Sequence, residues 1–222
     1  MVGPVFKRGD RAELTKYQPI ALLSSVSKVC ERVVHNKLYP FLTPYLSDMQ
    51  SGFKEHDSTT YQLTRLVQQW SESLDASKYD GVIFLDLQKA FDKVWHKVLL
   101  AKLSAAAISD SAFEWFQSYL SNRRQRTRVT DAISCPNFLL AGVPKGAILS
   151  PLLFSIYGND IVNCVDALED PEINLFADDT SFYLEDRSLP LRCPYDFRNP
   201  STPFQLGLTN GFFLLTHRKL LS

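Results

Sequence analysis

Cysteine, long apolar runs and net charge are all scarce in this chain of 222 residues. Its 4 cysteines are scattered, without a Cys-x-x-Cys pair, which argues against a zinc site and a disulfide framework and predicts free thiols. The longest apolar stretch, around AILSPLLFSIY (147–157), is too short and too interrupted to span a bilayer. The N-terminus has no apolar core of signal-peptide length. We therefore expect a soluble intracellular protein, in the nucleus or cytoplasm, that is neither secreted nor bound to a membrane.

The formal net charge is +0, so the charge of the whole chain favours no class of partner. Basic residues are nevertheless unevenly placed. The stretch SNRRQRTRV gathers four arginines: Arg123, Arg124, Arg126 and Arg128. Such a cluster is as consistent with contacts to nucleic-acid phosphates as with solvated surface charge, so both interpretations stay open. Lys7 and Arg8 form a weaker basic group near the N-terminus.

Apolar residues recur at helical spacing in several segments. They predict helices over 17–42, 59–76, 91–107, 111–122 and 150–165. The first helix is expected to begin near Pro19 and to end at Pro40, while Asp92 and Ser150 are expected to cap the third and the fifth. A β-branched and aromatic run predicts a buried strand over 80–87, and hairpins are predicted over 124–146 and 173–184.

The composition and the periodicity of the sequence change from Leu189 onward. Prolines fall close together there, and no clear periodicity returns until GFFLLTHRKLL (211–221). We therefore predict one domain over 1–186 and a Pro-rich, poorly ordered tail over 187–222.

Three carboxylates suggest a functional site. Asp86 ends the predicted strand, and Asp178 and Asp179 lie at the tip of the second predicted hairpin. Two carboxylates about 4 Å apart repel by roughly 4 kcal/mol at an effective dielectric of 20, and divalent cations relieve such repulsion. Mg²⁺ prefers carboxylate oxygens together with substrate phosphates. Each acid also has an ordinary interpretation, as a turn residue or a strand-end cap.

A haloacid-dehalogenase-like phosphatase is a weaker interpretation of the same acids. Such an enzyme needs a second acid two places after the first, where Gln88 stands here.

Three stretches in succession carry a more specific pattern: FLDLQKAFDKVWH (84–96), GVPKGAILSPLLFSIYGNDI (142–161) and LFADDT (175–180). They resemble the palm motifs of reverse transcriptases of non-LTR, LINE/jockey-like retrotransposons. Two earlier stretches, at 6–34 and 50–60, resemble the finger motifs of that family. The resemblance implies an α+β right-hand polymerase with fingers over about 1–78 and a partial palm over about 79–186. Its antiparallel palm sheet would pack on helices, and its thumb would be missing.

The resemblance also implies the chemistry. Asp86, Asp178 and Asp179 would be the catalytic carboxylates and, with the carbonyl of Leu87, would bind two Mg²⁺ ions, with Mn²⁺ as a substitute. The partners would be an RNA template, a DNA primer and deoxynucleoside triphosphates. Positioning and charge stabilisation would carry most of the phosphoryl transfer.

The nucleotide site implied by the resemblance contains Phe91, Lys145, Gly146 and Gln18. Phe91 occupies the position of an aromatic steric gate against the ribose 2′-hydroxyl, and Gly146 occupies a position where the backbone approaches the nucleotide. A core phenylalanine and an ordinary turn glycine are the alternatives.

The sequence departs from the family pattern in the fingers and the palm. Gln18 replaces an arginine that contacts the triphosphate, Lys145 replaces a glutamine, and Asp57 replaces an arginine of the second finger motif. Endonuclease and thumb motifs are not found. We therefore expect a fragment of a retrotransposon polyprotein with impaired polymerase activity. The alternative is a non-catalytic nucleic-acid-binding remnant.

Overall fold

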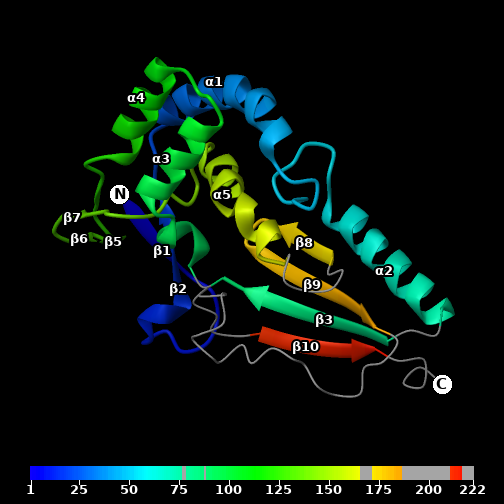
Figure 1. Ribbon diagram of the computed structural model, residues 1–222. Helices are drawn as coiled ribbons and strands as arrows, with labels where there is room; N and C mark the ends of the chain where they lie inside the picture. Colours follow the sequence, from blue (N-terminus) through cyan, green and yellow to red (C-terminus); the bar gives the residue numbers. More distant parts are fainter. Residues whose placement is uncertain (77–78, 88, 166–171, 187–210, 217–222) are drawn as a thin grey trace. The chain divides into compact units, whose positions relative to one another are not determined.

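The computed structural model describes residues 1–76, 79–87, 89–165, 172–186 and 211–216. Helices and antiparallel sheets are combined in it (Figure 1), as expected for an α+β protein. The chain forms two compact units, each built from two separate segments. The first comprises Met1–Leu46 and Lys89–Tyr157, and the second comprises Ser47–Gln88 and Gly158–Ser222. This division runs across the ranges assigned to fingers and palm, so that assignment stays a prediction.

The first unit combines helices with short strands. Its elements are β1 (Val2–Phe6), the 3₁₀ helix η1 (Leu14–Lys16), β2 (Tyr17–Ala21), α1 (Ser25–Leu42), η2 (Thr43–Tyr45), η3 (Ala90–Lys93), α3 (His96–Ala105), α4 (Asp110–Leu120), β4 (Arg124–Gln125), β5 (Arg128–Val129), β6 (Ala132–Ile133), β7 (Asn137–Phe138) and α5 (Ser150–Gly158). Its core consists of fully buried apolar side chains from the helices and the loops between them: Leu42, Val94, Leu99, Leu103, Phe116, Leu120, Leu149 and Leu153. None of the helices in the described ranges is long and apolar enough to cross a membrane.

The predicted helix over 17–42 is wrong in its first part. Residues Tyr17–Ala21 form β2, which pairs with β1 in an antiparallel register from Phe6↔Tyr17 to Val2↔Ala21. The helix α1 begins only at Ser25, because the hydroxyl of Ser24 accepts a hydrogen bond from the Ser27 amide (3.1 Å) and caps it. Pro40 lies inside the last turn of α1 instead of ending it.

The predicted helix over 91–107 is wrong in the same way. The chain first makes the 3₁₀ turn η3, after Lys89 adopts a left-handed conformation (φ +54°), and α3 begins only at His96. Asp92 therefore lies in the turn and caps no α-helix. The other helices are confirmed as α2, α4 and α5, although α5 ends at Gly158 and the 3₁₀ helix η4 (Asn159–Val165) follows it. Ser150 is the first helical residue of α5, and its hydroxyl donates to the Pro144 carbonyl (2.9 Å).

The second unit is built on a four-stranded antiparallel sheet (Figure 1). Besides η4, its elements are α2 (Thr59–Asp75), β3 (Tyr79–Asp86), β8 (Glu172–Phe176), β9 (Asp179–Asp186) and β10 (Gly211–Thr216). The strand order is β10-β3-β9-β8. One face forms a core of Leu85, Ile173, Leu175 and Phe182, against which Met49, Ile161 and Val162 pack. On the other face α2 is tied to the sheet by a hydrogen bond between the hydroxyls of Ser73 and Tyr183 (2.7 Å).

Residues 211–216 show that the predicted tail is not wholly without structure. They form β10, which pairs with β3 from Gly211↔Leu85 to Thr216↔Asp80. The apolar run GFFLLT supplies this strand. The rest of the predicted tail, 187–210 and 217–222, lies outside the described residues.

Candidate active site

Two of the three predicted carboxylates lie opposite each other in the sheet of the second unit. Asp86 is the last residue of β3, Asp179 is the first residue of β9, and the antiparallel register pairs them directly. Side chains of directly paired residues lie on the same face of a sheet. Asp178 occupies the two-residue turn that joins β8 to β9. The fold therefore brings all three acids to one end of the sheet, as the sequence predicted.

The three carboxylates influence one another. Partial desolvation raises the pKa of Asp179 above its ordinary value, and the negative charges of Asp178 and Asp86 raise it further. Among the residues that the structure describes, neither lysine nor arginine forms an ion pair with any of the three. Uncompensated negative charge of this kind favours the binding of a divalent cation.

The donor set fits a hard cation such as Mg²⁺. In the described part of the chain, no three His, Cys, Asp or Glu side chains are grouped so that they could hold a metal ion by themselves. Mg²⁺ in nucleotide-processing sites is usually bound by one or two carboxylates, with water and substrate phosphates completing its shell. A pair formed by Asp86 and Asp179 suits that mode of binding. Leu87 follows the first of them directly and is half-buried.

A cavity of about 350 Å³ adjoins the acid pair. Its lining is mostly apolar and comes from α2 and from the sheet: Thr59, Gln62, Leu63, Leu66, Phe84, Leu85, Asp86, Asn174, Phe176, Asp179, Thr180 and Ser181. The Nδ2 atom of Asn174 is buried there, and no acceptor for it exists among the described residues. Apolar walls and two carboxylates in one cavity are typical of a ligand site.

Three of the four predicted nucleotide-site residues lie in β2 or against it, in the first unit. The backbone carbonyl of Lys145 accepts a hydrogen bond from the Ala21 amide (2.8 Å). Gly146 has a φ of +99°, and a Cβ at this position would lie 3.3 Å from the Ala21 carbonyl oxygen, so a turn glycine is required here. Gln18 lies in the same strand and shares a face with Ile20, whose side chain lies against Gly146.

Phe91, the fourth predicted nucleotide-site residue, is both packed and partly exposed. Its ring stacks on Phe154, with the two centroids 4.7 Å apart and an interplanar angle of 23°. The Nζ atom of Lys145 lies 5.7 Å from the centroid of the Phe91 ring. The structure thus brings Phe91 and Lys145 together, although they are far apart in sequence.

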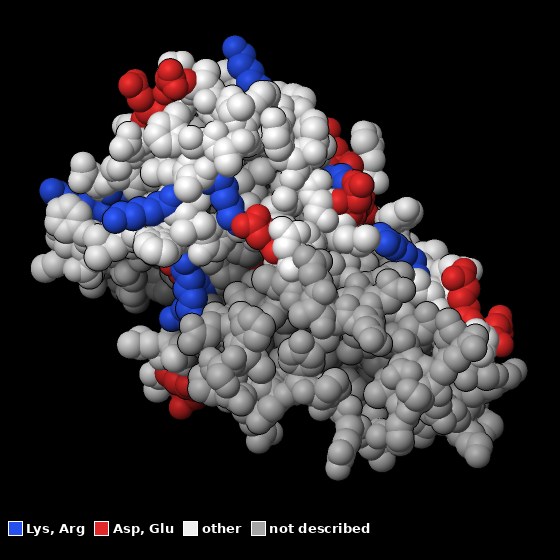
Figure 2. All heavy atoms as spheres, in the orientation of Figure 1, with Lys and Arg blue, Asp and Glu red and all other residues white. Residues whose placement is uncertain are grey.

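Two members of the arginine cluster stack on aromatic rings. Arg123 lies over the Tyr119 ring at 5.3 Å, and Arg124 lies over the Phe138 ring at 4.7 Å. Both line a second cavity, of about 220 Å³, together with Lys145. Figure 2 shows basic side chains gathered over the β4–β7 region. Stacked guanidinium groups beside a cavity are available to phosphates.

A buried carboxylate was missed by the sequence analysis. Glu31, in α1, is only 3% exposed. One carboxylate oxygen accepts from the Tyr119 hydroxyl (3.1 Å) and the other accepts from the Ile148 amide (2.7 Å). Burial and then the charge of Glu31 raise the pKa of Tyr119. The only signal in the sequence was a charge among the apolar positions of α1.

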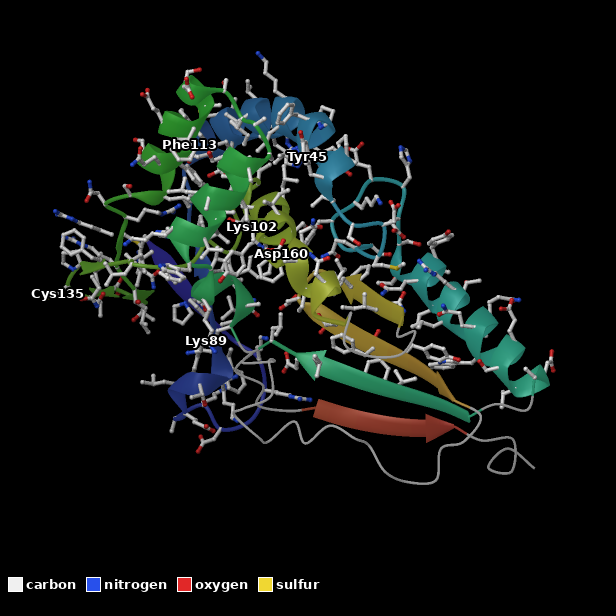
Figure 3. All side chains as sticks on the ribbon, in the orientation of Figure 1. Tyr45, Lys89, Lys102, Phe113, Cys135 and Asp160 are labelled. Atoms are coloured by element: carbon white, nitrogen blue, oxygen red, sulfur yellow. The ribbon has the colours of Figure 1, made fainter. Side chains whose placement is uncertain are left out.

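Lys102 is a second residue that the sequence analysis did not single out. It extends from α3 toward α5 (Figure 3), where its ammonium donates to the carbonyl of Tyr157. These two contacts join the segment just before α5 to α1 and the last turn of α5 to α3.

The fold is shared with a solved telomerase structure. The chain superposes on apo telomerase from Candida tropicalis, truncated from its C-terminal domain, with a TM-score of 0.50 and 15% identity. That superposition covers 71% of this chain and 34% of the telomerase chain. The likeness shows that the two chains share a fold.

Sequence comparison then identifies the family. The profile of the reverse transcriptase (RNA-dependent DNA polymerase) family matches residues 5–198, and the chain belongs to this family. It is 38% identical over 165 residues to the "Probable RNA-directed DNA polymerase from transposon BS" of Drosophila melanogaster, covering 72% of this chain and 18% of that protein. It is 34% identical over 173 residues to the RNA-directed DNA polymerase from mobile element jockey of Drosophila funebris, covering 75% and 19%. The predicted resemblance is confirmed, and the chain spans about a fifth of the length of the curated relatives it matches.

Proposed function

We propose that this chain carries the catalytic acids and part of the nucleotide site of an enzyme that extends a DNA primer on an RNA template. The pairing of Asp86 with Asp179, with Asp178 in the adjoining turn, is the observation that carries the proposal. Relatives of the chain are named RNA-directed DNA polymerases, which supports the same reaction. We assign the sheet with the acids to a partial palm over about 79–186, and residues 1–78 to the fingers.

Asp86, Asp178, Asp179 and the carbonyl of Leu87 are the proposed ligands of two Mg²⁺ ions. Divalent ions bound there would acidify the primer 3′-hydroxyl and neutralise charge on the triphosphate. The carboxylates need no proton transfer of their own, because their role is to hold charge and geometry. The cavity lined by α2 and the sheet gives a bound substrate access to both paired carboxylates.

Residues of the first unit would select the nucleotide. Phe91, which is partly exposed, would exclude a ribose 2′-hydroxyl, and its ring packs on Phe154. Gly146 would let the backbone approach the nucleotide closely. Lys145 would change the contact beside the nucleotide, because its charged side chain stands where the family carries a neutral glutamine.

Gln18 and Lys145 make this copy an impaired enzyme in our proposal. A glutamine cannot form the charge-assisted, bidentate hydrogen bonds that an arginine forms with phosphate. The alternative of a non-catalytic nucleic-acid-binding remnant is not favoured, because all three acids are retained and binding alone would not require them.

The proposal is tested by metal binding and by primer extension on the same variants. The 222-residue chain should bind Mn²⁺, and Asp86→Asn and Asp179→Asn should each weaken this binding at least about tenfold, since even outer-shell changes cost 10–100-fold. Asp131→Asn, which removes an exposed carboxylate elsewhere, is the matched control. Extension of a DNA primer on RNA should be slow in the wild-type chain and lost in Asp86→Asn. Equal Mn²⁺ binding by all variants would overturn the proposal.

A further inference from the structure

A short segment of the second unit runs along the outer edge of the sheet, beside the turn of Ala177 and Asp178 that joins β8 to β9. Within the described residues β8 is an edge strand, and residues 49–52 lie against it. The Ser51 amide donates to the Leu175 carbonyl (2.8 Å), and the Leu175 amide donates to the Met49 carbonyl (2.9 Å). Gln50 and Leu175 thus form a parallel bridge. We call residues 49–52 the brace.

The side chain of Gln50 reaches from the brace to the turn. It is only 3% exposed, and its Oε1 atom accepts from the Gly52 amide (2.9 Å) and from the Ala177 amide (3.1 Å). Both partners are backbone donors, so only the oxygen of the side-chain amide can make these bonds. One buried oxygen therefore joins the brace to the first residue of the turn.

Gly52 brings the two backbones into direct contact. A Cβ at this position would lie 1.9 Å from the Ala177 nitrogen, 2.7 Å from its Cα and 2.8 Å from the Phe176 carbonyl carbon. All three atoms belong to the backbone, so no side-chain rotation can make room. Only glycine allows the brace to lie this close to the turn.

The turn itself requires outside support. Ala177 has a φ of +60°, in the left-handed region that glycine usually supplies in two-residue hairpin turns. A residue that carries a Cβ persists in this region only where its surroundings hold it. The next two residues are Asp178 and Asp179, so the conformation of Ala177 decides where both carboxylates lie.

We propose that Gln50 and Gly52 are positioning residues: they hold the strained Ala177 turn so that Asp178 and Asp179 keep their places relative to Asp86. This inference deepens the proposed function and rests on it. The described hydrogen bonds of the brace go to the backbone of residues 175–177, to Ser47, to Arg65 and to the brace itself, and none goes to a carboxylate of the three acids.

The test uses substitutions of Gln50 in the full chain, because Gly52→Ala displaces the turn outright and is expected to prevent folding. Gln50→Met keeps length and volume but loses the acceptor, whereas Gln50→Glu keeps an acceptor. Ser73→Ala is the matched control, because it removes a buried hydrogen bond to the same sheet, at Tyr183, away from the turn. Each variant is measured for Mn²⁺ affinity and for hydrogen exchange of the Ala177 amide.

Gln50→Met is expected to weaken Mn²⁺ binding about 10–100-fold, as for other residues that orient metal ligands, and to expose the Ala177 amide to exchange. Gln50→Glu should stay close to wild type in both measurements. Ser73→Ala should lower the unfolding temperature but leave the Mn²⁺ affinity and the exchange of the Ala177 amide unchanged. Wild-type Mn²⁺ affinity in Gln50→Met, or protection of Ala177 that survives the loss of the acceptor, would overturn the inference.

Asp86→Asn separates this inference from the proposed function. If Asp86→Asn weakens Mn²⁺ binding and Gln50→Met does not, the brace inference is wrong and the function stands. If Asp86→Asn has no effect, the proposed function fails. The exchange of Ala177 in Gln50→Met then decides by itself whether the brace holds the turn.

Discussion

Asp86 and Asp179 are fixed opposite each other by the backbone pairing of β3 with β9, before any metal ion or substrate arrives. Like charges placed opposite each other in a sheet destabilise it. In the ligand-free fold the carboxylates of Asp86 and Asp179 therefore repel each other, and a cation bound between them would attract both.

Asp179→Asn should stabilise the folded chain at neutral pH. The pKa of Asp179 is raised in the folded state above its ordinary value of 3.8. As the pH rises from the ordinary pKa of an aspartate toward the raised pKa of Asp179 in the folded state, Asp179 loses its proton in the unfolded chain first. The folded state therefore loses stability over this pH interval. The gain from Asp179→Asn should be roughly 0.2–1 kcal/mol at pH 7 and should vanish near pH 3.

Thermal unfolding at both pH values, in chelator, measures this difference. An equal unfolding temperature for wild type and Asp179→Asn at pH 7 would show that the carboxylates do not repel. Added Mg²⁺ should favour the wild type, because a ligand stabilises the state that binds it.

Restoring the family residues should raise polymerase activity. Hydrogen bonds to charged groups contribute about 1.5–3 kcal/mol, so Gln18→Arg combined with Lys145→Gln should raise kcat/KM roughly 10–100-fold. Primer extension on RNA measures this effect, both in the given chain and in a fusion to the remainder of the jockey polymerase. Asp178→Asn in the fusion should abolish extension. Robust extension by the unaltered chain alone would contradict our expectation of an impaired enzyme.

Phe91→Leu should relax selection against ribonucleotides, while Phe154→Leu should not. Both substitutions break the same stacked pair, which contributes about 0.5–1.5 kcal/mol, so both should lower stability to a similar degree. Only the loss of Phe91 would open space beside the sugar, and steric selection of this kind amounts to roughly 10–200-fold. Competition between ribo- and deoxynucleoside triphosphates in the fusion separates the two roles. Unchanged discrimination between ribo- and deoxynucleoside triphosphates in Phe91→Leu would show that Phe91 serves only as a core residue.

Glu31→Ala should be among the most destabilising changes in the first unit. It leaves both the Tyr119 hydroxyl and the Ile148 amide without their acceptor, at a cost of about 3 kcal/mol in unfolding free energy. Tyr119→Phe, which leaves the bond to Ile148 intact, should cost about 1 kcal/mol. Urea denaturation of the three proteins gives the comparison. Equal losses for the two variants would show that the bond to Ile148 contributes nothing.

The hairpin that carries the acids was predictable because its signals are local. Alternation of apolar and polar residues predicts the strands, and the acids between them predict the turn. The pairing of β3 with β9 was predictable only as a hypothesis. Nothing in the sequence near Gln50 or Gly52 indicates a contact with Ala177, since that contact joins residues far apart in the chain.

The helix over 17–42 failed for a different reason. Its apolar spacing predicts a helix, yet Val26, Val29 and Val33 are 79%, 66% and 56% exposed. The buried residues of α1 are Leu38, Leu42 and Glu31, and hydrophobic periodicity cannot reveal the last of these. Pro19 was taken as the start of a helix, although a proline fits equally well in a two-stranded hairpin such as β1–β2.

The second unit consists of two segments that are separated in sequence, so the ribosome synthesises them at different times. Residues 47–88 leave the ribosome long before their partners in 158–186, with the whole second segment of the first unit emerging between them. Roughly ninety residues separate Asp86 from Asp179, and translation at about 5–20 residues per second makes β3 wait roughly 5–20 s for β9. During this interval the apolar strand VIFL is synthesised but unpaired. The pair formed by Asp86 and Asp179 is thus assembled late, and the nascent chain carries an aggregation-prone edge until β9 pairs with β3.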